Sequence, residues 1–184
     1  MRNGKTVLVE VGTGPLSMCF LHLLWDRSDI ELYGFEPHPG YFAEVRAAAG
    51  DRTNVHLFNV AIGDEPGKLK LYDEGTSSSL AGVSSPFAQH RKEDPEAKPY
   101  HMVDVKRVSD FDTGDWDILR VDTEGAEWFC LKHLVSRPRE IVVEIYNDLA
   151  TYINPHLWEI QDWARREGYR LTSIQDSDFI YTRA

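Results

Sequence analysis

The stretch Lys5-Thr-Val-Leu-Val-Glu-Val-Gly-Thr-Gly14 decides the fold class, because a β-branched apolar run passes directly into two glycines. Such a run predicts a strand buried on both faces, as in the middle of a parallel sheet. Pro15 then opens an apolar segment that predicts a helix over 15–25. The helical spacing places four side chains on the inward face: Leu16, Phe20, Leu23 and Leu24. Strand, glycine turn and helix form the small-molecule sites of open α/β sheets.

The remaining chain alternates between strand and helix patterns. Further strands are expected over 30–36, 54–62, 68–72, 100–108, 117–122, 140–146, 168–174 and 178–182. Helices are expected over 40–49, 123–134 and 155–167. This alternation predicts an α/β fold with a mainly parallel sheet, in which 68–72 returns along 54–62 as a hairpin.

Length, charge and cysteine content narrow the class of protein. The 184 residues favour a single domain over 1–184, and the net charge of −10 argues against a nucleic-acid partner. No apolar run reaches the roughly 20 residues needed to span a membrane. Cys19 and Cys130 lie in apolar helical patterns typical of buried, reduced thiols. The first predicted strand begins almost at Met1, so no signal peptide is expected before it. We therefore expect a cytoplasmic protein with no membrane partner.

Residues 73–99 differ from the rest because they carry few apolar side chains. The segment is too long for an ordinary connection, which predicts either a mobile lid over a site or a partly disordered loop. It is not expected to be a domain linker, since the α/β pattern needs both sides to complete one sheet.

Three predicted parallel strands carry acids at or near their carboxyl ends: Glu10, Glu36 and Asp122. These acids should meet along one edge of the sheet. A carboxylate after the second strand can accept both hydroxyls of a ribose, as in nucleotide-binding α/β folds. Asp122 would lie across the sheet's switch point, beside the reactive end of the ligand.

Five blocks of sequence resemble the FkbM-type family of S-adenosylmethionine-dependent methyltransferases, in the family's order and spacing. They are Val9-Glu-Val-Gly-Thr-Gly14, Phe35-Glu-Pro-His-Pro39, Asn59-Val-Ala-Ile-Gly-Asp64, Ser77-Ser-Ser-Leu80 and Leu119-Arg-Val-Asp-Thr-Glu-Gly-Ala-Glu127. Asp122-Thr-Glu-Gly-Ala-Glu127 after a strand is the most specific of them.

The resemblance implies a Rossmann-like class I methyltransferase fold. It has a seven-stranded sheet with helices on both faces and an antiparallel last strand. It also implies methyl transfer to a hydroxyl oxygen, on a sugar or natural-product acceptor. The residues implied to hold S-adenosylmethionine are Glu10, Gly12, Thr13 and Gly14 at its methionine part, Glu36 at the ribose, Pro37, Asn59, Val60 and Ala61 around the adenine, and Asp122 near the methyl group.

An alcohol acceptor gains from a base that removes its proton during methyl transfer. Asp122 is the first candidate for this base, followed by Glu124, Glu144 and His38. Glu124 and Glu127 could equally be first-turn acids that the helix dipole favours. No metal site is expected, because neither the cysteines nor the other histidines show ligand spacing.

Two other functions fit parts of the sequence. A NAD(P)-dependent oxidoreductase would also use Glu36 for a ribose, but Pro15-Leu-Ser17 stands where a third glycine of the dinucleotide motif would allow close helix packing. A non-catalytic nucleotide-binding module of the same fold is the second alternative. The acceptor is expected to be a small molecule or a glycan, and a second copy of the chain is a further candidate partner.

Overall fold

The computed structural model describes residues 4–83, 98–148 and 152–183. Its main sheet contains β1 (Thr6–Val11), β2 (Ile30–Phe35), β3 (Val55–Phe58), β8 (Ile118–Val121), β9 (Glu140–Glu144), β12 (Tyr169–Gln175) and β13 (Asp178–Arg183). The strand order is β12-β13-β9-β8-β1-β2-β3. The five strands from β3 to β9 are parallel, and β13 is antiparallel to both neighbours. This confirms the predicted seven-stranded, mainly parallel sheet with an antiparallel last strand.

Helices pack on both faces of this sheet. The 3-10 helix η1 (Phe20–Leu24) and α1 (Pro39–Ala49) bury their apolar side chains against one face. On the other face, α2 (Glu127–Lys132) and α3 (Leu157–Arg166) cover the centre of the sheet. The alternation of side chains along β1 divides its residues between the two cores, with Leu8 facing η1 and Val9 facing α2.

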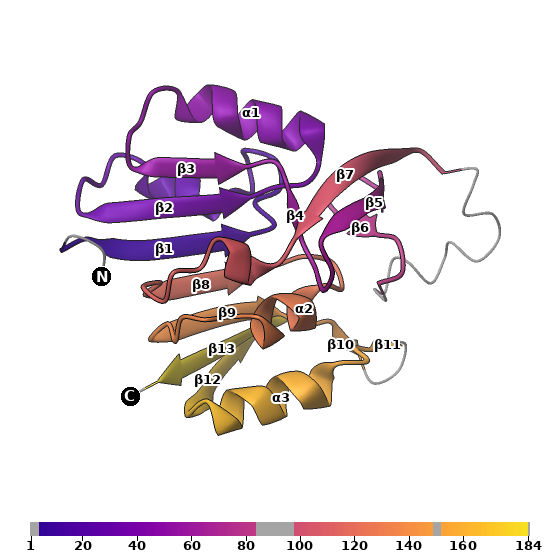
Figure 1. The fold of residues 1–184 in the computed structure, drawn as a ribbon. Helices are drawn as coiled ribbons and strands as arrows, with labels where there is room; N and C mark the ends of the chain where they lie inside the picture. The colour runs from indigo at the N-terminus through magenta and orange to yellow at the C-terminus, as the bar shows by residue number, and fades with distance from the viewer. Residues whose placement is uncertain (1–3, 84–97, 149–151, 184) are drawn as a thin grey trace.

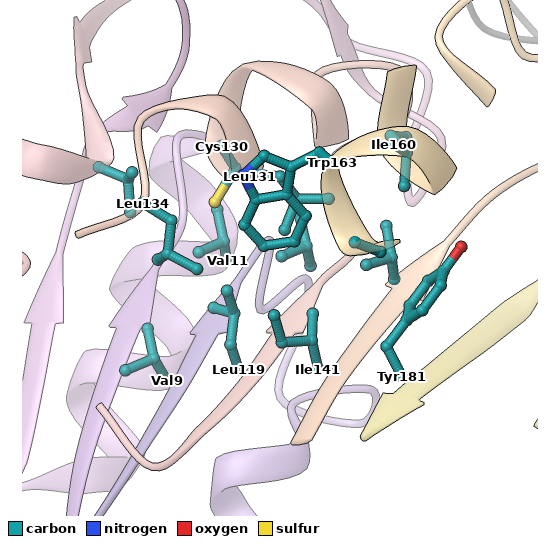
Figure 2. Close-up of a cluster of buried hydrophobic side chains, with 14 of the residues drawn as sticks. Val9, Val11, Leu119, Cys130, Leu131, Leu134, Ile141, Ile160, Trp163 and Tyr181 are labelled. Carbon is teal, nitrogen blue, oxygen red and sulfur yellow. The ribbon is translucent and has the colours of Figure 1, made fainter. Parts of the chain in front are cut away.

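The larger core lies under α2 and α3. Figure 2 shows strand residues such as Val9, Leu119 and Ile141 below the side chains of Leu131 and Trp163 from the two helices. Each of these side chains is at most 6% exposed. Full burial of one such side chain contributes about 1.5–3 kcal/mol, so this packing fixes the positions of β1, β8 and β9.

A second, smaller sheet stands beyond the carboxyl ends of β1, β2 and β3 (Figure 1). It contains β4 (Ala61–Ile62), β5 (Gly67–Tyr72), β6 (Ser79–Leu80) and β7 (Tyr100–Lys106), in the order β4-β7-β5-β6. The expected single strand over 54–62 is therefore wrong, because it divides into β3 and β4, which belong to different sheets. The expected hairpin is also wrong, since β5 pairs with β7 and β6.

Asn59 is the physical reason for that division. Its side-chain amide donates to the carbonyl oxygens of Glu36 at 2.8 Å and Pro37 at 3.2 Å. These bonds hold the chain at the end of β3 against the loop after β2, so it leaves the main sheet there. The strand pattern in the sequence does not show this break, because the residues on both sides of it are apolar: Phe58 before it, and Val60 to Ile62 after it.

The expected α-helix over 15–25 is wrong. The chain forms turns after Pro15 and then the 3-10 helix η1, because the amides of Phe20 and Leu21 donate to the buried Glu10 carboxylate. The tighter 3-10 winding rotates the inward face. Leu21 is fully buried, whereas Leu23 is 73% exposed.

The other elements agree with expectation except at their ends. The predicted helix over 123–134 is shorter than expected, since residues 123–126 form a bend before α2. Short elements that were not expected are β6, β10 (Asn147–Asp148), β11 (Tyr152–Ile153) and the 3-10 helix η4 (Val108–Asp110). Of the predicted lid over 73–99, residues 84–97 lie outside the described residues. Over residues 4–83, 98–148 and 152–183, no helix has the length and apolar character to cross a bilayer.

Candidate functional site

A cavity enclosing about 780 Å³ of space, part of it continuous with solvent, lies at the carboxyl ends of β1, β2 and β8. The loops that follow these three strands form its floor, and the small sheet forms one wall. The small sheet and the chain that leads into it contribute five apolar residues to the lining: Val60, Ala61, Ile62, Leu71 and Leu80. The cavity therefore has an apolar side that suits a flat ring, and a polar side formed by the residues that follow the strands.

The floor is built where the β1 loop touches the β8 loop. Gly12 has φ of +87°, and a Cβ atom on it would lie 1.7 Å from the Asp122 carbonyl oxygen. The Asp122 amide donates to the Val11 carbonyl oxygen at 2.9 Å. Only glycine fits this contact, so the first glycine of the predicted loop is explained by close approach of two backbones.

Glu36 lies on the cavity lining and is only 6% exposed. Its carboxylate accepts from the Gly14 amide at 2.7 Å and the His38 amide at 2.8 Å. Burial raises the pKa of Glu36 to about 7, although these two amides oppose the shift. The backbone bonds fix the carboxylate beside the cavity, where its remaining lone pairs can accept hydrogen bonds from a ligand's hydroxyls.

The other predicted cofactor residues divide into two groups. Thr13, Pro37, Val60 and Ala61 line the cavity. Asn59 does not line it, because its amide is directed at the backbone after β2. The structure thus gives Asn59 a role in shaping the loop, one layer behind the cavity wall.

Glu10 also lies behind the cavity. It is fully buried and absent from the lining, and its carboxylate accepts from the Phe20 and Leu21 amides at 3.2 and 3.3 Å. It pairs with Arg120 at 3.2 Å. Burial raises the pKa of Glu10 to about 7, and Arg120 limits the rise. Glu10 therefore organises η1 and Arg120 from below the cavity floor.

Arg120 is a cavity residue that the sequence patterns did not single out. It lines the cavity, and its guanidinium pairs with Glu10 at 3.2 Å and with Asp122 at 3.1 Å. Parallel pairing of β1 with β8 puts Glu10 directly beside Arg120. A charged residue within the apolar run Ile118-Leu-Arg-Val121 was the available signal.

Three of the predicted catalytic acids come together. Oxygen atoms of Asp122, Glu124 and Glu144 lie within 4.8 Å of one another, close enough to hold a metal ion, although the sequence predicted none. Asp122 and Glu124 line the cavity, whereas Glu144 accepts a hydrogen bond from Ser177 at 3.0 Å behind them. Burial and the adjacent Asp122 raise the pKa of Glu144 to about 9. The cluster therefore holds a proton at neutral pH.

Glu127 belongs to the same sequence motif but has a different role. It is 2% exposed and accepts from the Thr123 amide and hydroxyl and from the Gly125 amide, at 2.8–3.3 Å. These contacts hold the bend in which Glu124 adopts φ of +53°. The first-turn interpretation thus fits Glu127, while Glu124 is turned toward the cavity.

His38, the fourth candidate, lies apart from the three acids. Its ring stacks on Tyr41, and its Nε2 lies 3.5 Å from Asp73, which also contacts His101 at 3.5 Å. The ring nitrogens and carboxylate of His38, Asp73 and His101 could also surround a metal ion. However, His38 Nδ1 accepts from the Tyr41 amide at 3.3 Å, which places the proton of the neutral ring on Nε2 and disfavours a metal there.

The raised pKa values predict an unusual pH dependence of stability. Glu10 and Glu36 bind protons more tightly in the folded state than in the unfolded state. Their contribution to the free energy of unfolding is therefore complete below their ordinary pKa and is lost as pH rises toward about 7. The free energy of unfolding should fall between about pH 5 and 7 by up to about 1.4 kcal/mol per pH unit for each group. Urea denaturation at a series of pH values measures this slope.

Glu36→Gln is the matched variant for that measurement, because it keeps the shape but cannot titrate. Its slope between about pH 5 and 7 should be clearly shallower than that of the wild type. A wild-type stability that rises over this interval, or an unchanged slope in the variant, would contradict the assignment.

Comparison with known proteins identifies the family of this chain. The model of the methyltransferase FkbM domain matches residues 17–171. No match was found among curated protein sequences. Two solved structures share the fold at low sequence identity. Precorrin-6y C5,15-methyltransferase from Geobacter metallireducens is 13% identical with a TM-score of 0.50, over 98% of this chain and 81% of that one.

The second structure is Aeropyrum pernix fibrillarin, solved with natively bound S-adenosyl-L-methionine. It is 11% identical with a TM-score of 0.52, and the match covers 97% of this chain but only 65% of the fibrillarin chain. Both likenesses support the class I methyltransferase fold predicted from the sequence. The family match covers most of the chain: the protein belongs to the FkbM methyltransferase family, with S-adenosylmethionine as its cofactor.

Proposed function

We propose that this protein is an O-methyltransferase that transfers the methyl group of S-adenosylmethionine to a hydroxyl of a small molecule or glycan. The observation that carries the proposal is that Glu36, after β2, lines the same cavity as Asp122 and Glu124, after β8, with β1 between the two strands. A ribose-binding carboxylate and a cluster of acids near the reaction end are the groups this chemistry needs.

The cavity residues fit the cofactor chemically. Gly12 and Gly14 line the cavity without side chains, so a ligand can approach the backbone of the β1 loop. Glu36 offers a fixed carboxylate to the ribose hydroxyls. The apolar wall that includes Val60 and Leu71 suits the adenine ring. Of the predicted cofactor residues, Glu10 and Asn59 would act through neighbours, because both lie behind the lining.

Bound S-adenosylmethionine supplies a methyl group that is already strongly electrophilic. The protein has to hold the acceptor oxygen in line with that group and take up its proton. The proposal assigns the uptake of this proton to Asp122, because Asp122 lines the cavity and Arg120 contacts one of its oxygens. Glu144, already protonated, donates toward the acid cluster and holds the geometry of Asp122.

The identity of the ligand can be tested with the free protein. S-adenosylhomocysteine at about 100 times its dissociation constant should stabilise the fold by about 2.7 kcal/mol, which corresponds to a rise in Tm of about 5–10 °C. NAD and NADP should produce no comparable shift. Stabilisation by a nicotinamide nucleotide alone would favour the oxidoreductase alternative, for which Glu36 is the supporting residue.

Turnover is tested with methyl-labelled S-adenosylmethionine and a panel of hydroxylated sugars, glycans and natural products. Label should appear on an oxygen of at least one acceptor, with equimolar formation of S-adenosylhomocysteine. Cofactor binding without methylation of any panel member would favour the non-catalytic module. A cytoplasmic location and a homo-oligomer stay predictions.

A further inference from the structure

Arg120 provides the one arginine or lysine side chain on the cavity lining of the described residues. We propose that Arg120 binds the carboxylate of the cofactor's amino-acid end and makes the site selective for ligands that carry it. The inference rests on the proposed methyl-donor site. It assigns a specificity-determining residue that neither the motifs nor the family match identifies.

The glycine turn of the β1 loop, Gly12 to Pro15, has no free backbone N–H for this carboxylate. The amides of Gly12 and Thr13 both donate to the Phe35 carbonyl oxygen, at 2.9 and 3.2 Å. The Gly14 amide donates to Glu36 at 2.7 Å. Pro15, at the next position, has no amide hydrogen. Each backbone donor of this turn is therefore already used or absent, at the point where a glycine-rich loop would otherwise offer N–H groups to an anion.

Backbone amides of the loop after β8 are also already used in hydrogen bonds. The Asp122 amide donates to Val11, and the amides of Thr123 and Gly125 donate to Glu127. The side chains that this loop turns toward the cavity are the acids Asp122 and Glu124, which repel a carboxylate. An anionic group entering this end of the cavity thus meets Arg120 as its favourable partner.

Arg120 is held ready for that contact. One terminal nitrogen pairs with Glu10 and the other with Asp122, and the side chain remains 26% exposed. Because a guanidinium carries five N–H donors, these two contacts leave others for a ligand. The support on both sides fixes the planar fork, which favours charge-assisted bonds to a carboxylate.

A purely structural role is the competing explanation. Glu10 is fully buried, and Arg120 could be present only to balance its charge. The two roles differ in what the loss of Arg120 does to ligands with and without a carboxylate. If Arg120 is only structural, its loss weakens the binding of both kinds of ligand alike. If it has the proposed role, its loss weakens the binding of the ligand with a carboxylate only.

The test compares S-adenosylhomocysteine with its decarboxylated analogue by calorimetry. The wild type should bind S-adenosylhomocysteine about 10- to 100-fold more tightly, as expected for a charge-assisted contact. Glu10→Gln serves as the background, since its amide oxygen can still accept from Phe20 and Arg120. This variant should keep the preference within about threefold.

Adding Arg120→Met to that background removes the cation without leaving a buried carboxylate alone. The double variant should bind the two ligands within about threefold of each other, with affinity for the decarboxylated analogue unchanged. Arg120→Lys in the wild type should keep part of the preference, because it keeps the charge but loses the fork.

Two results would overturn the inference. The double variant could keep the full preference for S-adenosylhomocysteine, or it could lose affinity for both ligands equally. Failure of the proposed function is distinguishable from either result, since it would appear as a wild-type protein that binds neither ligand.

Discussion

Replacing Gly12 by alanine should destabilise the protein by about 3 kcal/mol or more, because the new Cβ would lie 1.7 Å from the Asp122 carbonyl oxygen. The neighbouring atoms are backbone, so no side-chain rotation can relieve the overlap. The φ of +87° adds strain for any residue with a Cβ. Urea denaturation of the ligand-free variant measures the loss, and S-adenosylhomocysteine binding should fall with it.

Gly14→Ala is the matched control for that experiment. Gly14 also has a positive φ, of +62°, but the nearest atom to its added Cβ is Met18 Cβ at 3.8 Å. Only the backbone strain remains, so the expected cost is about 1–2 kcal/mol. Equal losses in the two variants would show that conformation alone, and not the contact between the β1 and β8 loops, sets the requirement at Gly12.

Asp122→Asn should lower kcat by about 100- to 10,000-fold, the range expected when a general base is removed. The substitution keeps the size of the side chain and its contact with Arg120 through the remaining oxygen. Affinity for S-adenosylhomocysteine should therefore change by less than about threefold. Steady-state turnover with an accepted hydroxyl substrate and calorimetry with S-adenosylhomocysteine separate the two effects.

Glu144→Gln tests whether the loss is specific to the proton acceptor. Glu144 has a pKa of about 9 and is neutral at pH 7, so glutamine resembles its native form. We expect kcat at pH 7 to stay within about fivefold of the wild type. An Asp122→Asn variant with near-normal turnover would assign the proton transfer to another group, with Glu124 the next residue on the cavity lining.

The sequence was sufficient for the parts of the fold that depend on continuous apolar runs. β1, at the centre of the sheet, is buried on both faces along almost its whole length, and few other structures suit such a run. The acids at the ends of β2 and β8 were found for the same reason, since parallel strands end at a common edge. Glu36 and Asp122 both lie on the cavity lining.

The errors arose where a tertiary contact overrides a local pattern. The amides of Phe20 and Leu21 bind Glu10, which sets the winding and exposed face of residues 15–25. Asn59 ends β3 through carbonyl groups more than twenty residues earlier in the chain. The hydrogen bonds of Glu10 and Asn59 cannot be predicted from the spacing of hydrophobic residues. Arg120 was missed because its partner Glu10 is adjacent only through strand pairing.

The small sheet has a consequence for how this protein family can diversify. The chain leaves the main sheet after β3 and rejoins it at β8, and neither strand pairs with β4, β5, β6 or β7. Leu71 and Leu80 from this excursion nevertheless complete the cavity wall. The excursion can therefore be lengthened, shortened or exchanged during evolution without shifting the register of the main sheet. Changes in the excursion would alter this wall of the cavity while the main sheet keeps Glu36 and Asp122 at their common edge.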